Sequence, residues 1–149
     1  MRAHRFEPLP PEKLARWELF PDFPGLGPIF PGLVGLSVEE VRTDYARMRM
    51  TYKPELRQPA GVVHGGAIAT LIDTSVVPAI AWPYETVPKL LTLTMNIRYL
   101  GALVEEDAIA EAWIDTRGRS IVYCSSEVTS ASGRQVADGT LVYKVPPIS

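Results

Sequence analysis

The sequence predicts an α+β fold in which one curved antiparallel sheet wraps around a single long helix. The stretch from residue 65 to about residue 82 is apolar on nearly all sides, which is typical of a buried helix. Strand-like segments lie on both sides of this stretch, two before it and four after it. Short turns separate several of these segments, so antiparallel pairing is expected. A sheet of about six strands around one helix satisfies this order.

The first 32 residues differ from the rest, and we divide the chain into a proline-rich extension at residues 1–32 and one domain at residues 33–149. Seven of the 14 prolines lie before residue 32. Residues 11–20 predict a short helix, because a proline stands at its start, and residues 21–32 predict a loop. Four large apolar side chains favour packing of the extension against the domain, with a lid over a pocket as the alternative: Trp17, Phe20, Phe23 and Phe30.

Alternation of apolar and polar side chains locates the strands. Residues 33–52 predict two strands joined near Thr43 and Asp44. Residues 91–99 alternate strictly, which predicts four polar side chains on one strand face: Thr92, Thr94, Asn96 and Arg98. Three more strands are expected at residues 107–115, 120–130 and 135–145, separated by the turn-like sequences TRGR and ASGR. Pro78 is expected to kink or loosen the last turns of the helix, because it lacks an N–H donor.

The composition argues against several classes of protein. A chain of 149 residues suits one domain, and a net charge of −2 argues against nucleic-acid binding, which needs a basic face. One Cys and two His fall short of a usual zinc site, so we expect neither a metal nor another cofactor. No run of residues suits a membrane span or a signal peptide, so we expect a cytoplasmic protein without a membrane partner.

One carboxylate stands out, because Asp73 lies in the middle of the predicted buried helix. Burying an unpaired carboxylate is costly, so it must be hydrogen-bonded, protonated or open to a water-filled site. Hydroxyls of Thr70 or Thr74 are candidate donors for a purely structural role. Perturbed carboxylates also concentrate at functional sites, so a catalytic role is the alternative.

The helix is preceded by His64, Gly65 and Gly66. The first N–H groups of a helix have no partner within it, and the helix dipole adds to their attraction for an oxyanion. A tight turn into the helix is the plainer interpretation. Gly65 and Asp73 are eight residues apart, about 12 Å along a helix axis. If both act on one carbonyl, they must come from different subunits of a symmetric dimer.

The sequences HGGAIATLIDT at residues 64–74 and LTMNIRYL at residues 93–100 resemble the acyl-CoA thioesterases of the hotdog fold, of the phenylacetate-pathway type. The resemblance extends from about residue 33 to residue 145. It implies the sheet-around-helix architecture and an acyl-CoA substrate. It also implies homodimers in which the two sheets join, and these dimers often pair into tetramers. Each dimer would hold two active sites.

The resemblance also implies roles for individual residues. Asp73 would be the catalytic carboxylate, and the N–H of Gly65 from the partner subunit would polarise the thioester carbonyl. His64 would hold the loop and the thioester, and Thr92 stands where the family often has a serine that orients the acid or water. Gln58 departs from the asparagine that the family uses to orient water, although a longer amide can reach similarly. Five further residues are predicted to bind substrate: Gly66, Asn96, Arg98, Arg117 and Arg119.

We therefore expect hydrolysis of an acyl-CoA thioester, with Asp73 as general base or as nucleophile. Two alternatives are a non-catalytic acyl-CoA-binding module of the same fold and a dehydratase acting on a hydroxyacyl thioester. A sensor has little use for a lone carboxylate in its helix, and a dehydratase would carry a different histidine-containing loop.

Overall fold

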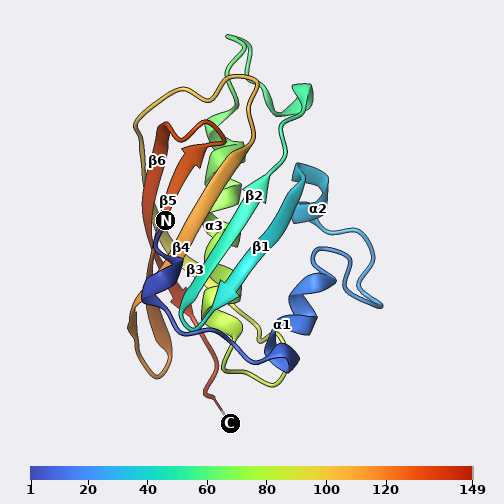
Figure 1. Cartoon of the computed structure of the whole chain (residues 1–149), viewed down its shortest axis with the longest axis vertical. Coiled ribbons are helices and arrows are strands. Elements are labelled where there is room, and N and C mark those ends of the chain that lie inside the picture. The colour runs from blue at the N-terminus through green and yellow to red at the C-terminus, as the bar shows by residue number, and fades with distance from the viewer. Residues whose placement is uncertain (149) are drawn as a thin grey trace.

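A computed structural model describes residues 1–148 and has a six-stranded antiparallel sheet curved around helix α3 (Figure 1). The strand order is β1-β2-β4-β5-β6-β3. The predicted α+β architecture is confirmed. The strands are β1 (Leu36–Arg42), β2 (Tyr45–Met50), β3 (Leu91–Tyr99), β4 (Ala108–Arg117), β5 (Ile121–Ser130) and β6 (Gln135–Lys144).

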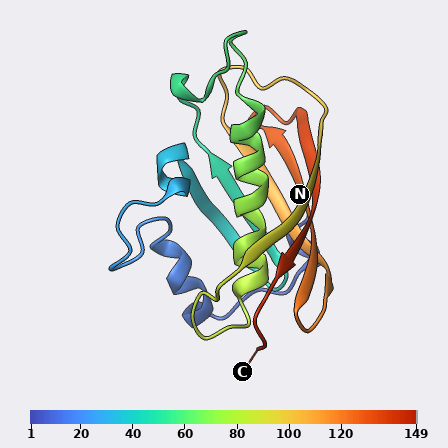
Figure 2. The ribbon, with the colours of Figure 1, turned by 180° about the vertical axis from the view of Figure 1, so that it is seen from behind.

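Helix α3 (Gly65–Ala81) lies in the concave face of the sheet (Figure 2). Its sheet-facing side chains, among them Leu71, Ile72 and Val76, are fully buried and form the core with the inner side chains of the strands. The helix packs closely on β6, because a Cβ atom at Gly139 would lie 3.0 Å from Cγ2 of Ile72. It continues through Pro78 to Ala81.

Strand β3 forms one edge of the sheet and pairs with β6. A register shift between Thr92 and Thr94 interrupts the pairing. The predicted common face is therefore wrong for Thr92, since a bulge moves the following residues to the opposite face, while Thr94, Asn96 and Arg98 still share one face. Thr92 faces α3, whereas Asn96 and Arg98 lie on the outer face of the sheet.

Several apolar side chains of β3 are exposed, although apolar and polar residues alternate along it as in a half-buried strand. They are Leu91, Leu93, Met95 and Tyr99, between 38% and 61% exposed. An edge strand also carries unpaired backbone groups along its free side. The free side of β3 is thus suited to pairing with another strand.

The extension contains a 3₁₀ turn at Ala3–Arg5 and two short helices, α1 (Pro11–Glu18) and α2 (Phe30–Val34). The helix predicted at residues 11–20 is confirmed over Pro11–Glu18, whereas Leu19 and Phe20 form a turn. The loop predicted at residues 21–32 is wrong at its end, because α2 begins at Phe30 and crosses the proposed boundary at residue 33. Gly35, with φ of 90°, ends α2, so β1 begins at Leu36. Trp17 is buried as expected, whereas Phe30 is 60% exposed.

The extension packs against β1, the strand at the other edge of the sheet, near the end of that strand. Pro8 forms a β-bridge with Arg42 at the end of β1, and the N–H of Thr43 donates to the carbonyl of Glu7 at 3.0 Å. Helix α1 lies beside β1 (Figure 1), where Trp17 packs in a cluster with Val41 and Ala81. The extension therefore packs against β1 and the C-terminal end of α3.

Within residues 1–148, no helix combines the length and the apolar character needed to cross a membrane.

Candidate active site

The loop before α3 is held so that it delivers His64 to the helix start. The N–H of His64 donates to the carbonyl of Leu56 at 2.7 Å, and the N–H of Val63 donates to the carbonyl of Leu103 at 2.8 Å. His64 is the N-cap of α3, and its Nδ1 accepts the N–H of Gly66 at 2.8 Å. Because Nδ1 is an acceptor, neutral His64 carries its proton on Nε2.

The first two helical N–H groups thus differ in what they can do. His64 accepts the N–H of Gly66, so in this structure that N–H has a partner within the chain, and the substrate contact predicted for Gly66 stays a prediction. Among residues 1–148, no acceptor takes the N–H of Gly65. The carbonyl of Gly65 accepts the Tyr99 hydroxyl at 2.7 Å. A hollow of about 410 Å³ opens beside this glycine, lined by residues that include Gln58, Ile68 and Tyr99.

Asp73 receives two hydroxyl donors on one carboxylate oxygen. Thr92 on β3 donates to Oδ1 at 2.8 Å, and Tyr143 on β6 donates to the same atom at 2.5 Å. The hydroxyls of Thr70 and Thr74, which the sequence suggested as donors, do not supply these bonds. The Thr70 hydroxyl instead donates to the carbonyl of Gly66. Asp73 as a residue is half-buried, and within residues 1–148 its second carboxylate oxygen, Oδ2, has no hydrogen-bond donor.

Tyr143 is a site residue that sequence reasoning missed. An aromatic residue in an alternating strand indicates core packing, and Tyr143 is indeed only 4% exposed. Its hydroxyl lies near Asp73 because β3 pairs with β6 and Thr92 stands opposite Tyr143. Burial and the nearby Asp73 carboxylate raise the pKa of Tyr143, so the phenol remains a proton donor.

Gln58 lies near Gly65 but turns toward its own loop. Its side-chain Oε1 accepts the N–H of Ala60, and its backbone closes the turn with Gly61 and Val62. Its amide makes no hydrogen bond to Asp73 within the described residues.

The predicted polar contacts on other elements are spread over the molecule. Arg98 makes a two-bond ion pair with Asp138 on the outer face, and Asn96 lines the same outer hollow. Arg117 binds Asp44 and the carbonyls of the last turn of α3, at the helix end opposite Gly65. Arg119 is exposed in the turn between β4 and β5. The chain therefore does not bring these residues together with Asp73.

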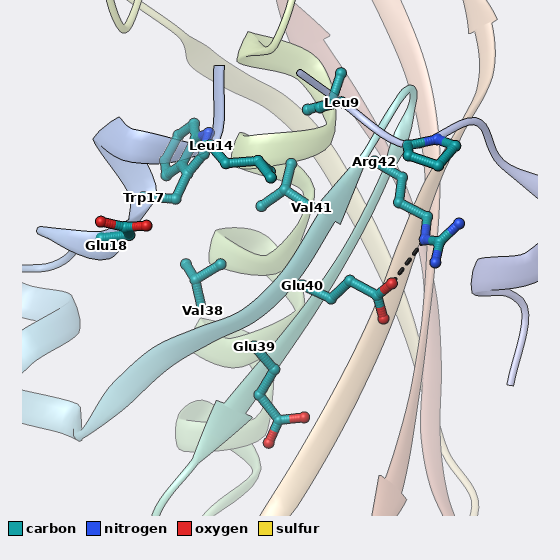
Figure 3. A pocket seen from close by; sticks show the side chains of 10 residues that line it. Leu9, Leu14, Trp17, Glu18, Val38, Glu39, Glu40, Val41 and Arg42 are labelled. Atoms are coloured by element: carbon teal, nitrogen blue, oxygen red, sulfur yellow. Dashed lines mark hydrogen bonds and ion pairs between the residues drawn. The ribbon is translucent and has the colours of Figure 1, made fainter. Parts of the chain in front are cut away.

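Another hollow, of about 350 Å³, lies between the extension and β1 (Figure 3). Two of the carboxylates that line it form ion pairs with arginines: Glu39 accepts hydrogen bonds from Arg47 and Arg49, and Glu40 pairs with Arg42 and Arg47. Burial alone would raise the pKa of Glu39, but these hydrogen bonds outweigh it and hold that pKa below its usual value. The walls are formed by apolar side chains of both elements: Leu9, Leu14, Trp17, Val38 and Val41. This hollow suits packing better than acid–base chemistry.

The single cysteine, Cys124, is not placed to act as a nucleophile. Cys124 is buried in β5, and burial raises the pKa of its thiol to about 12. Within residues 1–148, no cluster of three or more His, Cys, Asp or Glu side chains is arranged to hold a metal ion.

Sequence comparison gives a family and two named relatives. The model of the thioesterase superfamily matches residues 60–137, more than half of the chain. A protein of Halobacterium salinarum, named as a candidate esterase, is 31% identical over 114 residues, covering 73% of this chain and 75% of that protein. Human acyl-coenzyme A thioesterase 13 is 29% identical over 92 residues, covering 60% of this chain and 65% of that protein.

Solved structures share the fold. The E. coli PaaI protein from the phenylacetic acid degradation operon superposes with a TM-score of 0.72 at 16% identity, covering 80% of this chain and 86% of that one. A hypothetical thioesterase from Streptococcus pneumoniae TIGR4, solved with coenzyme A, has a TM-score of 0.66 at 22% identity, covering 76% and 91%. At these identities the likeness establishes the hotdog fold alone.

Proposed function

The chain belongs to the thioesterase superfamily, and from this premise we propose that it hydrolyses an acyl-CoA thioester to a free carboxylic acid and CoA. In this reaction the oxygen of water adds to the thioester carbon, and the carbonyl oxygen takes up the negative charge. The C–S bond then breaks and releases CoA as the thiol. The name of the human relative and the CoA bound to the pneumococcal structure support the choice of substrate class.

The observation that carries the proposal is the unoccupied N–H of Gly65 at the start of α3. A backbone donor held by a capped helix is already oriented, and the helix dipole adds positive potential at the same point. A donor of this kind lowers the barrier by roughly 3–4 kcal/mol when a negative charge develops on the carbonyl oxygen. His64 has the supporting role of fixing the loop from which Gly65 projects.

Asp73 is the proposed acid–base residue. As a general base it would take a proton from the attacking water, an effect of roughly 100- to 10,000-fold. As a nucleophile it would form a mixed anhydride that water then hydrolyses. Single-turnover hydrolysis in ¹⁸O-labelled water tests the nucleophilic route: label that enters the Asp73 carboxylate would rule out a pure general-base mechanism, because water attacks the carboxyl carbon of Asp73 only in a mixed anhydride.

We further propose that each site combines Gly65 of one chain with Asp73 of another. About 12 Å of helix axis separates the two residues within a chain, whereas antiparallel α3 helices of a two-fold dimer would bring them together. The exposed apolar side chains along the free side of β3 support pairing of two sheets at this edge. Pairs of dimers would form the tetramer, and we propose a cytoplasmic location.

The test is thiol release from a panel of acyl-CoA esters with short, aromatic and long acyl groups. We expect Asp73→Asn to lose roughly 100- to 10,000-fold in kcat, while Asp22→Asn, which changes an exposed aspartate of the extension, keeps the full rate. Full activity of Asp73→Asn would contradict the proposed chemistry. No thiol release by the unmodified protein from any ester would indicate a binding module.

A further inference from the structure

We propose that Tyr143 is a positioning residue for Asp73: with Thr92, it fixes carboxylate oxygen Oδ1 and leaves Oδ2 as the atom that acts on the substrate. This inference rests on the function proposed above, in which Asp73 is the catalytic acid. It concerns a residue that only the three-dimensional pairing of β3 with β6 identifies.

Two acceptor atoms of Asp73 lie within hydrogen-bonding distance of the Tyr143 hydroxyl. Its hydroxyl oxygen lies 2.5 Å from Oδ1 of Asp73 and 2.8 Å from the backbone carbonyl oxygen of the same residue. A phenol has one proton, and a carboxylate oxygen is the stronger acceptor, so the proton is directed to Oδ1. Because the ring is buried in the sheet, the hydroxyl approaches Asp73 from the core side and water does not compete for it.

Thr92 reaches the same oxygen from the edge of the sheet. Thr92 and Tyr143 are directly opposite each other on β3 and β6, so both side chains point toward α3. Their hydroxyls lie 2.8 Å and 2.5 Å from Oδ1, and within residues 1–148 no hydrogen bond reaches Oδ2. Rotation of the carboxylate would break both bonds. The free oxygen therefore has one orientation, which a base or nucleophile needs in order to meet its target.

A core position by itself does not require this hydroxyl, because phenylalanine fills the same volume. The experiment is therefore Tyr143→Phe. Its matched control is Tyr45→Phe, because Tyr45 is also buried and its hydroxyl lies 2.6 Å from carboxylate Oε2 of Glu111, on another part of the sheet. Both variants lose one buried hydroxyl bonded to a carboxylate, but only one of these carboxylates is Asp73.

We expect Tyr143→Phe to lower kcat roughly 10- to 100-fold and to leave KM within about twofold, because the lost bond orients the acid rather than the substrate. Tyr45→Phe should keep its kcat. Both rates are measured at a temperature where circular dichroism shows each variant folded. A merely structural role predicts similar losses of thermal stability in both variants and an unchanged kcat for each folded molecule.

Combining Tyr143→Phe with Asp73→Asn tests whether the tyrosine acts through the aspartate. We expect no further loss below the residual rate of Asp73→Asn. An equal loss in both backgrounds would overturn the inference, as would full kcat of Tyr143→Phe alongside an inactive Asp73→Asn. Full activity of Asp73→Asn would instead overturn the proposed function itself, so the two failures are distinguishable.

Discussion

Replacing Gly65 by proline removes one N–H group and little else. Gly65 is the first residue of α3, a position that accepts proline because its N–H has no helical partner. His64 before it has ψ of 134°, the extended conformation that a residue preceding proline adopts. A new Cβ would lie 3.3 Å from the Tyr99 ring, a contact that can be relieved by a few tenths of an ångström. Gly65→Ala is the matched control, since it adds the same Cβ and keeps the N–H.

The lost N–H is the proposed oxyanion donor. We therefore expect Gly65→Pro to lower kcat by roughly 100- to 1,000-fold relative to Gly65→Ala, the usual effect of removing one such donor. Thermal unfolding of the two variants should be similar. Equal kcat values, measured by thiol release from the best acyl-CoA ester, would refute the role of this N–H.

A heterodimer of Gly65→Pro and Asp73→Asn chains tests the shared site. If each site takes Gly65 from one chain and Asp73 from the other, one site carries both substitutions and the second carries neither. Co-expression with two different tags and purification of the mixed species should then recover about half of the wild-type activity per dimer. If both residues of a site came from one chain, every site would carry one defect. Failure of the heterodimer to exceed the two parents would refute a site built across the interface.

Three further predictions concern assembly, packing and acid stability. Met95→Lys places a charge on the exposed edge of β3; analytical ultracentrifugation should show monomers that lack hydrolysis, and fully active monomers would contradict the shared site. Gly139→Ala places a methyl 3.0 Å from Cγ2 of Ile72; overpacking of about 1–3 kcal/mol should lower Tm by roughly 2–12 °C, and adding Ile72→Leu, which removes Cγ2, should restore part of it. The pKa of Glu39 is lowered in the folded chain, so its ionised form stabilises the fold at pH values above 4.5, the ordinary pKa of a glutamate, and this contribution is lost as the pH falls below 4.5. Glu39→Gln should therefore make Tm fall less steeply as the pH is lowered. An unchanged fall of Tm would contradict the ion pairs as its cause.

The central helix and its cap were predictable because their signals are local. A segment that is apolar on nearly all sides has to be buried, and Asp73 within it is conspicuous for that reason. The glycines after His64 likewise mark a helix start with free donors. These inferences need no knowledge of which strands are neighbours.

The surroundings of Asp73 were not predictable because they depend on pairing between distant segments. The alternation around Leu93 is intact in the sequence, so nothing local marks the register shift that separates Thr92 from Asn96 and Arg98. Tyr143 has the same difficulty, since its hydroxyl becomes significant only when β6 is known to pair with β3. Residue type and the alternation of apolar and polar residues predicted the strands. They did not predict the strand order that brings the hydroxyls of Thr92 and Tyr143 to Asp73.

The bridge between Pro8 and Arg42 also bears on the proposed assembly, because it occupies one end of the sheet edge opposite β3. A sheet with two accessible edges can add a further chain at each end, and repeated addition produces a fibre. Here the N-terminal residues and α1 pack against the edge strand β1, which leaves β3 as the edge strand that is free to pair with another chain. Pairing through β3, as proposed, uses that edge in both partners at once. The proposed dimer would then be a twelve-stranded sheet with β1 and its extension at each end, and it would offer no further free β3 edge to another chain.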